Sequence, residues 1–530
     1  MKEKFCRDIT EGKTYLGIEL GSTRIKAVLV TASGEPIASG GHDWENKFEN
    51  NIWTYSLEDV RTGITDCFSK LKQDVRDKYG VPLTQVSSIG ISAMMHGYLA
   101  FDKDDNLLVP FRTWRNTMTD EAASRLTKEF NFNIPQRWSI AHLYGSMLNN
   151  ENHIDKISKI TTLSGYVHYL LTGEFVLGVG DASGVFPIDS ETNDYEKSMI
   201  EKFNQKLAEK GLKYRLEDIL PKVLATGENA GVLTEQGAKL LDPAGEFKAG
   251  APLCPPEGDA GTGMVATNSI SERTGNVSAG TSIFAMIVLE KPLSKVYEQI
   301  DIVTTPTGKP VAMVHCNNGS SDIDAWANLF VEFSKLSGNE MSKGKVLDLL
   351  FETALSGDSD CGGLFSCNYI SGEHITGFSQ GRPLFARTQN CRFNLSNFFR
   401  NHLYSAVSSL KVGMNILQKE NVKIDRLLGH GGYFKARDAG QTVLASATGA
   451  PVSVMETAGE GGSYGVALLA SYMMNKNGRT LDEFLNQDIF KDSKISTIVP
   501  TDEQISGFEK YFDRYLKGLN IEAAAVESLE

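Results

Sequence analysis

Two short turns in the sequence combine glycine with hydroxyl side chains, a combination suited to binding phosphate groups. The first, Gly21-Ser22-Thr23, lies between apolar strands within residues 15–30, and the second, Gly280-Thr281-Ser282, repeats this layout within residues 276–287. The backbone N–H groups and hydroxyls of such turns can point at anionic oxygens. One turn of this kind is ordinary turn chemistry. The pair, however, indicates two phosphate-binding turns that act on one nucleotide.

The acid with the best surroundings for catalysis is Asp259, in the segment Pro255-Pro-Glu-Gly-Asp-Ala-Gly-Thr-Gly263. Glycines on both sides of Asp259 leave room for a substrate to approach its carboxylate. Such a carboxylate can accept the proton of a sugar hydroxyl while the oxygen attacks phosphorus, a task that depends mainly on position. The segment by itself leaves open the alternative that Asp259 only stabilises a glycine-rich turn.

These residues need a scaffold, and the first half of the chain predicts an α/β sheet. Ser56 opens a helix with a capping-box-like pattern, apolar residues follow at helical spacing, and Gly80 ends it. A strand over residues 86–92 then runs into Met94-Met-His-Gly97. Strands that alternate with helices indicate an α/β protein.

The second half of the chain repeats this order of elements. It contains the strand-turn-strand at residues 276–287, a helix after the cap candidate Ser396, and the strand-like segment 426–432. We therefore predict that the two halves are structural duplicates with little sequence identity.

The length of the chain predicts two large domains. Its 530 residues exceed the size at which one hydrophobic core stops growing. Gly261, Gly263 and the polar stretch of residues 267–274 separate the two patterns. We place the domains at residues 1–264 and 265–530.

Composition and charge exclude several classes of function. With 41% hydrophobic and 22% charged residues, the sequence is typical of a soluble globular protein. No apolar run approaches the roughly 20 residues that span a bilayer, and no secretion signal is recognisable, which predicts a cytoplasmic protein. The net charge of −13 disfavours nucleic acids and acidic membranes as partners. Seven cysteines without a C-x-x-C pair predict reduced thiols.

Two familiar motifs were tested against this layout. The P-loop, G-x-x-x-x-G-K followed by Ser or Thr, is absent from the sequence, so phosphate binding needs another scaffold. Gly461-Gly-Ser-Tyr-Gly465 matches the G-x-S-x-G of hydrolases, but the strand candidate 452–455 ends too early for a nucleophile elbow. We interpret this segment as a glycine-rich entry to an apolar helix, where small residues allow close packing.

Taken together, these motifs resemble the FGGY carbohydrate kinases over nearly the whole chain. The family opens with a phosphate hairpin of an acid, a Gly-Thr turn and a basic residue, similar to Glu19-Leu-Gly-Ser-Thr-Arg-Ile-Lys26. The most specific match is Leu170-Leu-Thr-Gly-Glu174 followed by Asp181-Ala-Ser-Gly184. Other matching landmarks are Met94–Gly97, Thr113–Asn116, Trp138–Ile140, Gly280–Ser282 and Leu428–Gly432.

The resemblance implies an α/β, actin-like ATPase fold of two ribonuclease-H-like domains with a catalytic cleft between them. It implies ATP and Mg²⁺ in the cleft, a sugar-binding first domain, a nucleotide-binding second domain, and Asp259 as the general base. Closure of the cleft would exclude water. The implied roles are phosphate binding by Gly21, Ser22, Thr23, Lys26, Gly280, Thr281 and Ser282, adenine binding by Gly431 and Gly432, sugar binding by Met95, His96, Trp114, Asn116 and Asp259, and metal binding by Glu19 and Asp259.

Two residues or segments depart from the family pattern, and several roles have structural alternatives. Glu19 replaces the usual Asp and is one methylene longer, so either the metal shell shifts outward or a water is lost. Tyr433-Phe-Lys-Ala-Arg437 stands where many members have a small residue and then Ser or Asn, which puts base contacts there in doubt. The alternatives are a buried histidine with a satisfied hydrogen bond for His96, simple packing for Trp114 and a solvated strand residue for Lys26.

The sugar is the open part of the prediction. Met95 and His96 stand where a glycerol kinase carries an Arg-Glu pair, and a Met-His-Gly ending is similar to the pentulose kinases. This favours phosphorylation of the terminal hydroxyl of a ketopentose. L-ribulose and D-xylulose are the leading candidates, and the sequence does not discriminate between them because epimers differ only in the direction of one hydroxyl. Another ketose or polyol, an actin-like ATPase, and a sugar sensor without phosphorylation stay open, as does a homodimer.

Overall fold

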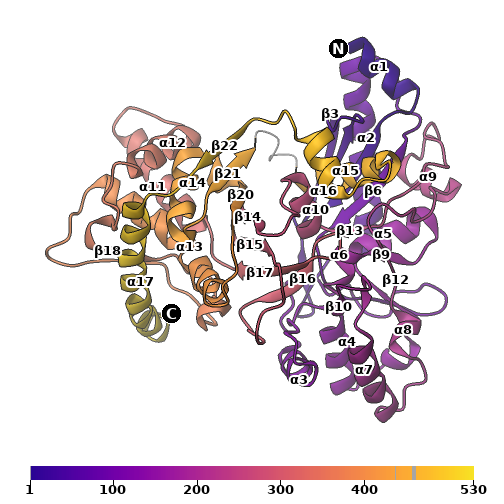
Figure 1. Ribbon diagram of the computed structural model, residues 1–530, viewed down its shortest axis with the longest axis horizontal. Coiled ribbons are helices and arrows are strands. Elements are labelled where there is room, and N and C mark those ends of the chain that lie inside the picture. The colour runs from indigo at the N-terminus through magenta and orange to yellow at the C-terminus, as the bar shows by residue number, and fades with distance from the viewer. Residues whose placement is uncertain (1, 436, 456–460, 530) are drawn as a thin grey trace. The chain divides into compact units, whose positions relative to one another are not determined.

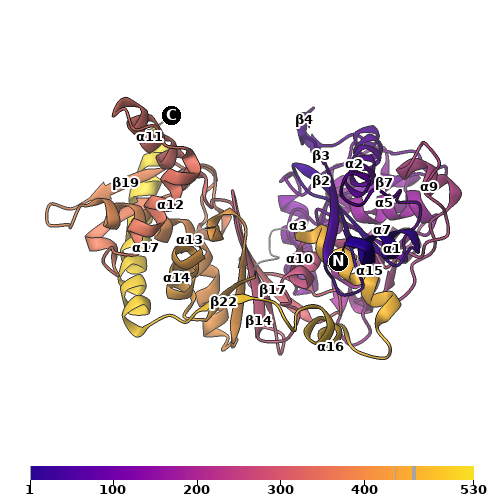
Figure 2. The same ribbon diagram turned by 90° about the horizontal axis from the view of Figure 1, so that it is seen from above.

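The structure is a computed structural model that describes residues 2–435, 437–455 and 461–529. The chain forms two compact units (Figures 1 and 2). Unit 1 comprises Met1–Ile270, Asp301–Val311 and Glu460–Asp492, and unit 2 comprises Ser271–Ile300, Ala312–Gly459 and Ser493–Glu530. Each unit is built around a mixed sheet covered by helices.

The sheet of unit 1 is built on a hairpin that carries the first glycine-hydroxyl turn. Its strand order is β13-β6-β1-β2-β3. The hairpin strands β1 and β2 are antiparallel, whereas β6 pairs parallel with β1, and β13 pairs parallel with β6. The strands span β1 (Tyr15–Leu20), β2 (Arg24–Val30), β3 (Pro36–Asp43), β6 (Ser88–Ala93) and β13 (Glu257–Gly258).

The alternation of side chains along β1 decides which helix covers each face of this sheet. Leu16 and Ile18 belong to the hydrophobic core that also contains Phe68 of helix α2 (Leu57–Tyr79). Residues of opposite parity point to the other face, where a Cβ at Gly17 would lie 2.0 Å from the carbonyl oxygen of Ser463 in helix α15 (Gly461–Asn475). Close packing of α15 therefore requires glycine at position 17, and the predicted glycine-rich helix entry is confirmed.

The predicted first helix is confirmed at both ends, whereas a later helix begins earlier than predicted. Ser56 accepts a hydrogen bond from the backbone N–H of Asp59 (2.9 Å), and Gly80 ends α2 with φ 72°. In unit 2, the N-cap of helix α13 (Leu395–Lys419) is Asn394, whose side chain accepts from Asn397 N (2.9 Å). The prediction of Ser396 as the cap was wrong because Asn394 offers an equally good capping side chain one half-turn earlier.

Unit 2 repeats the core layout of unit 1, as predicted. Its hairpin strands β14 and β15 are antiparallel, and β20 pairs parallel with β14. Strand β21 pairs parallel with β20 and antiparallel with β22. The order within unit 2 is β17-β15-β14-β20-β21-β22. The strands span β14 (Thr274–Ala279), β15 (Ile283–Val288), β17 (Pro310–Cys316), β20 (Arg426–His430), β21 (Val452–Met455) and β22 (Ile495–Ile498).

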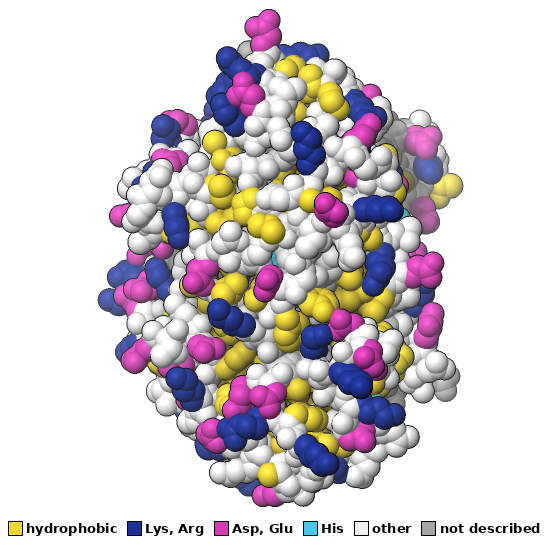
Figure 3. All heavy atoms as spheres, turned by 90° about the vertical axis from the view of Figure 1, so that its right-hand side faces the viewer, with side chains coloured by type: hydrophobic (Ala, Val, Ile, Leu, Met, Phe, Trp, Pro, Cys, Tyr) yellow, Lys and Arg dark blue, Asp and Glu magenta, His cyan; other side chains and the backbone are white. Residues whose placement is uncertain are grey.

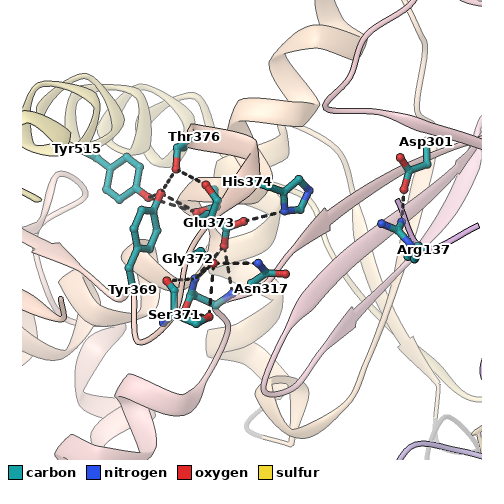
Figure 4. Close-up of polar contacts among 12 residues, drawn as sticks. Arg137, Asp301, Asn317, Tyr369, Ser371, Gly372, Glu373, His374, Thr376 and Tyr515 are labelled. Atoms are coloured by element: carbon teal, nitrogen blue, oxygen red, sulfur yellow. Dashed lines mark hydrogen bonds and ion pairs between the residues drawn. The ribbon is translucent and has the colours of Figure 1, made fainter. Parts of the chain in front are cut away.

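The compact units do not follow the single boundary between residues 264 and 265 that we predict for the domains. Gly261 and Gly263 lie inside helix α10 (Asp259–Ala266), and unit 1 continues to Ile270. Residues 301–311 belong to unit 1 because Asp301 forms an ion pair with Arg137 and accepts from Asn133 Nδ2 at 3.1 Å (Figure 4). Residues 461–492 belong to it because α15 packs on β1 and β6.

The other helices and strands have the following bounds. In unit 1 they are α1 (Lys2–Thr10), β4 (Lys47–Glu49), β5 (Ile52–Thr54), β7 (Leu99–Phe101), α3 (Asp120–Phe130), α4 (Ser139–Leu148), β8 (Lys159–Thr161), α5 (Leu163–Thr172), β9 (Val176–Gly178), α6 (Val179–Ala182), β10 (Ile188–Asp189), β11 (Asp194–Tyr195), α7 (Lys197–Glu209), α8 (Leu216–Ile219), β12 (Lys222–Leu224), α9 (Glu235–Leu241), β16 (Asp301–Thr304) and α16 (Leu481–Phe484). In unit 2 they are α11 (Ser321–Leu336), α12 (Lys343–Ala354), β18 (Leu364–Cys367), β19 (Leu384–Arg387), α14 (Arg437–Thr448) and α17 (Asp502–Ser528).

The thiols and the surface agree with the composition. All seven cysteines, each within the described part of the chain, are free. Among the described residues, no helix is both long enough and apolar enough to cross a membrane. On the face drawn in Figure 3, acidic and basic side chains are interspersed.

A buried histidine in α4 predicts how the stability of unit 1 depends on pH. His142 is fully buried, its ring nitrogens have no hydrogen-bond partner among the described residues, and burial lowers its pKa to about 3. Between about pH 6.5 and this value the unfolded chain binds a proton that the folded chain does not, so stability falls as pH falls. Relative to wild type, His142→Leu is expected to gain about 1.4 kcal/mol for each pH unit below about 6.5.

Chemical denaturation of both proteins at about pH 5 and about pH 7.5 tests this expectation. Because all other titrating groups are shared, their contributions cancel in the difference between the two proteins. An equal difference in unfolding free energy at both pH values would contradict a neutral, buried His142.

Candidate active site

Three strands of unit 1 end side by side, so that the predicted site residues that follow them lie at one edge of the sheet. Leu20 of β1 is in register with Ala93 of β6, and Ala93 is in register with Gly258 of β13. The residues that directly follow these three strand ends, Gly21, Met94 and Asp259, therefore lie next to one another. In addition, the N–H of Met94 donates to the carbonyl of Leu20 at 2.9 Å. The carboxyl ends of parallel strands are where ligands bind in sheets of this kind.

The first glycine-hydroxyl turn has its carbonyl groups held by the protein. Trp44 Nε1 donates to the carbonyl of Gly21 (2.7 Å), Tyr55 OH donates to that of Ser22 (2.6 Å), and the N–H of Trp44 donates to that of Thr23 (3.1 Å). The rings of Trp44 and Tyr55 stack with centroids 4.2 Å apart. Since carbonyl oxygens would repel a phosphate, fixing them in this way suits the turn to an anion.

Glu19 lies beside this turn and interacts with the start of α15. Its Oε2 accepts a hydrogen bond from the N–H of Ser463 at 3.0 Å, and a Cβ at Gly462 would lie 2.4 Å from its Oε1. Glu19 is in register with Lys26 across the hairpin. Burial, followed by the negative charge of Asp259, raises the pKa of Glu19 to about 7. The longer side chain thus reaches the N-terminus of a helix, which stabilises a carboxylate.

Asp259 is the first residue of α10 and is anchored to the end of β6. Its Oδ1 accepts a hydrogen bond from the N–H of Met95 at 3.1 Å. Thr262, one turn further along α10, is bonded through its hydroxyl to that of Ser92 (2.9 Å). The Asp259 side chain remains partly exposed, and desolvation raises its pKa to about 6. A carboxylate with this pKa is largely ionised at neutral pH and can accept a proton.

His96 has a strained backbone next to Asp259. Its φ is 71°, in the left-handed region that a non-glycine residue rarely adopts. The ring Nδ1 lies 3.3 Å from the carbonyl of Gly184, and a Cβ at Gly184 would lie 2.6 Å from that nitrogen. The ring also stacks on Trp138 with centroids 6.1 Å apart. The glycine that ends the Asp181–Gly184 segment is therefore needed to admit the His96 ring.

Two of the predicted sugar-binding residues have clear structural contacts. Asn116 accepts a hydrogen bond from the N–H of Trp53 (2.9 Å), and its amide donates to the carbonyls of Trp53 (2.8 Å) and Thr113 (3.0 Å). Trp114 is partly buried against the core of unit 1. The contacts of Trp114 support its alternative of simple packing, and those of Asn116 fix its side chain to the backbone. Contact of either residue with a sugar stays a prediction.

Two buried acids behind Asp259 were not predicted from the sequence. Asp181 accepts from the hydroxyls of Thr162 (2.6 Å) and Ser164 through Oδ2, and burial raises its pKa to about 6. Glu257 accepts from the N–H groups of Gly180 (3.3 Å) and Asp181 (2.9 Å), and burial raises its pKa to about 8. Both acids lie in segments that drew attention for other residues, but their polar partners are distant in sequence, so spacing alone could not identify them.

The second glycine-hydroxyl turn lies in unit 2, beside the predicted adenine loop. The N–H of Gly280 donates to the carbonyl of Ser282 at 3.0 Å. Gly431 has φ 100°, and a Cβ there would lie 2.4 Å from the carbonyl oxygen of Ala279. Positions 280–282 and 431 are therefore neighbours within unit 2. Beyond Gly432, Tyr433 is buried with its hydroxyl on the carbonyl of Leu403 (3.0 Å), while residue 436 lies outside the described residues.

Apart from Trp114 and Asn116, the predicted site residues thus fall into two groups. Unit 1 brings together Glu19, Gly21–Thr23, Lys26, Met95, His96 and Asp259, and unit 2 brings together Gly280–Ser282, Gly431 and Gly432. That both groups act on one nucleotide stays a prediction. Among the described residues, no group of three or more His, Cys, Asp and Glu side chains is arranged to hold a metal ion.

Comparison with known proteins adds independent information. Residues 14–245 match the N-terminal domain, and residues 275–474 the C-terminal domain, of the FGGY family of carbohydrate kinases. The xylulose kinase of Haemophilus influenzae is 21% identical over 528 residues, which cover 96% of this chain and 99% of that protein. The crystal structure of ligand-bound xylulose kinase from Lactobacillus acidophilus superposes with a TM-score of 0.79 at 17% identity, covering 98% of this chain and 100% of that one.

A second solved structure is as similar in fold but differs in its named substrate. The gluconate kinase from Lactobacillus acidophilus has a TM-score of 0.79 at 16% identity, covering 98% of this chain and 99% of that one. Likeness at this level of identity carries information about the fold and leaves the sugar open.

Proposed function

Because the chain belongs to the FGGY family of carbohydrate kinases and has their actin-like fold, we propose that it transfers the γ-phosphate of ATP to the terminal hydroxyl of a ketopentose. The observation that best supports this proposal is the position of Asp259. It directly follows strand β13, whose end is in register with the ends of β1 and β6, and these two strands lead to Gly21 and Met94. A base and a phosphate-binding turn at one edge of one sheet are the parts that phosphoryl transfer needs.

In the proposed mechanism, Asp259 acts as the general base. The Met95 N–H holds one carboxylate oxygen. The carboxylate accepts the proton of the sugar hydroxyl while the hydroxyl oxygen of the sugar forms a bond to the γ-phosphorus. The bond between the γ-phosphorus and the bridging oxygen of ADP breaks. The products are the sugar phosphate, ADP and a proton on Asp259. In this proposal Ser22 and Thr23 offer phosphate donors in unit 1, and Thr281 and Ser282 offer them in unit 2. The N–H groups of Gly21 and Gly280 are bonded to the carbonyls of Arg24 and Ser282.

The residues near Asp259 fit a magnesium ion that also binds phosphate oxygens and water. Mg²⁺ prefers carboxylate oxygens and commonly uses only one or two from the protein. Glu19 and Asp259 supply such oxygens, and the negative charge of Asp259 raises the pKa of Glu19. The ion would neutralise charge on the phosphates. Glu19 and Asp259 would hold the ion, with the Glu19 carboxylate itself oriented by the backbone N–H groups of Gly462 and Ser463.

The proposed choice of a ketopentose rests on Met95 and His96. Both side chains are buried beside Asp259, and His96 has a left-handed backbone conformation of the kind that clusters at active sites. The family resemblance of this Met-His-Gly segment to pentulose kinases and the xylulose kinase relatives favour D-xylulose or L-ribulose.

A substrate panel tests the proposal. Purified protein with Mg-ATP is incubated with D-xylulose, L-ribulose, their enantiomers, a hexulose, gluconate and glycerol, and the release of ADP is measured. We expect sugar-dependent release that is largest with a ketopentose. Release that is independent of every sugar would instead support an ATPase, no release would support a sensor, and a maximum with gluconate or glycerol would exclude the ketopentose.

Gly280→Ala offers a direct test of the second phosphate-binding turn. A Cβ at this position has no atom within 4 Å, so the folded protein accommodates the methyl group. If a phosphate approaches the backbone there, the methyl group displaces it, and we expect the Kd for ATP to rise about tenfold or more. Calorimetric titration with ATP measures the change. An unaltered Kd in a variant of unaltered melting temperature would remove this turn from the nucleotide site.

A further inference from the structure

The loop of residues 317–320 in unit 2 contacts the second phosphate-binding turn directly. The N–H of Gly319 donates to the carbonyl of Thr281 (2.7 Å), and the N–H and hydroxyl of Ser320 donate to that of Gly280 (2.8 and 3.0 Å). A Cβ at position 319 would lie 2.3 Å from the Gly280 oxygen, so glycine is required for this approach. The position of the turn therefore depends on the position of the loop.

The side chain of Asn318 fixes this loop to the segment that follows β18. Its Oδ1 accepts from the N–H groups of Ile370 and Ser371 at 3.0 Å each. Its Nδ2 donates to the carbonyl of Ser371 at 3.2 Å and to Glu373 Oε2 at 3.1 Å. Asn318 is 4% exposed, so water cannot replace these bonds at low cost.

Glu373 is a buried carboxylate with no role in the proposed chemistry. Its side chain is fully buried, and its Oε2 accepts from both the N–H and the Nδ2 of Asn318 at 3.1 Å. Its Oε1 lies 3.7 Å from His374 Nδ1 (Figure 4). Burial raises its pKa to about 7. Burying an acid costs free energy. The hydrogen bonds to Asn318 are a structural reason for an acid at this position.

A second asparagine holds the same loop through its backbone. The Nδ2 of Asn368, which follows β18, donates to the carbonyls of Asn318 (3.2 Å) and Gly319 (3.1 Å). The side chain of Glu373 thus binds the side chain and N–H of Asn318, and the side chain of Asn368 binds the carbonyls of Asn318 and Gly319.

We infer that Asn318, Asn368 and Glu373 are positioning residues that place the turn Gly280–Ser282 for nucleotide binding. We call them the asparagine clamp. They act through the loop 317–320 and do not themselves touch the substrate. The inference rests on the proposed function of the turn. All the residues that would hold the turn in place for the nucleotide belong to unit 2.

Asn318→Ala tests the clamp, with Asn397→Ala as a matched control. Asn397 is also a buried asparagine of unit 2, and its side chain accepts from the Asp358 N–H (2.6 Å) and donates to Asp358 Oδ2 and the Arg392 carbonyl (2.9 Å each). Both variants lose several buried hydrogen bonds, so both are expected to melt at a lower temperature. For each full-length variant, the Kd for ATP is measured by calorimetry and the KM for the sugar by ADP release.

For Asn318→Ala we expect the Kd for ATP to rise about tenfold, with the sugar KM within about twofold of wild type, and for Asn397→Ala we expect neither constant to change. An unaltered Kd in Asn318→Ala, or an equal rise in both variants, would overturn the clamp. If wild type itself binds no ATP, the proposed function fails, and the clamp fails with it.

Glu373→Gln and Glu373→Ala provide a second test if Asn318→Ala does not fold. The glutamine keeps an oxygen that can accept from Asn318, whereas alanine does not. We expect Glu373→Gln to retain most of the ATP affinity that Glu373→Ala loses. Equal affinities for the two variants would contradict a role that depends on the bond to Asn318.

Discussion

Replacing Asp259 with asparagine is expected to lower kcat by about three orders of magnitude while the affinity for the sugar changes little. Asparagine has nearly the same shape and can still accept the hydrogen bond from the Met95 N–H, which is 3.1 Å from Asp259 Oδ1. It cannot, however, accept the proton of the sugar hydroxyl. The loss therefore falls on the chemical step, and steady-state ADP release together with calorimetric sugar titration separates it from binding.

The pH profile gives the same experiment a second readout. Because the active form of a general base is ionised and the pKa of Asp259 is about 6, wild-type turnover is expected to fall as pH falls through this value. Asp189→Asn is the control, since this carboxylate bonds to the N–H of Glu191 (2.9 Å) in an exposed turn of unit 1. Wild-type turnover in Asp259→Asn would remove Asp259 from the chemistry.

Gly465→Ala is expected to destabilise unit 1 by about 3 kcal/mol or more, a large share of the roughly 5–15 kcal/mol that keeps a typical domain folded. A Cβ at this position would lie 1.9 Å from the carbonyl oxygen of Thr262. The clash is with the backbone, so no side-chain rotation relieves it. Helices α10 and α15 must separate, and α10 carries Asp259. Thermal unfolding monitored by circular dichroism measures the loss.

Gly344→Ala is the matched control for this substitution. Gly344 lies in helix α12, and a Cβ there meets no atom within 4 Å. Since alanine has the higher helix propensity, we expect this variant to gain about 0.5–1 kcal/mol. If Gly465→Ala melted at or above the temperature of wild type, the close packing of α10 on α15 would be wrong.

Local signals explain what could be predicted from the sequence. The cap Ser56 and the terminator Gly80 are set by neighbouring backbone groups, so the bounds of α2 follow from a short window. The hairpins likewise carry their turn chemistry in consecutive residues. Contacts between distant segments leave no such trace. Glu19 and Ser463 are bonded across 444 positions, and neither residue indicates the other.

The same limit applies to the candidate site. Asp259 stood out because glycines surround it in sequence, whereas Asp181 and Glu257 depend on partners brought in by folding. Gly261 and Gly263 gave the appearance of a linker because glycine marks both loops and close helix packing. Here a Cβ at Gly261 would lie 3.2 Å from Pro306, a residue of the returning segment 301–311.

The late return of the chain to unit 1 has a consequence for biosynthesis. The face of β1 that bears Gly17 is covered by α15, whose first residue is Gly461. While the ribosome is still translating the middle of the message, that face has no partner, and the nascent sheet exposes it to solvent. Unit 1 can therefore reach its native state only after residues 461–492 have left the exit tunnel, long after its first strand has emerged.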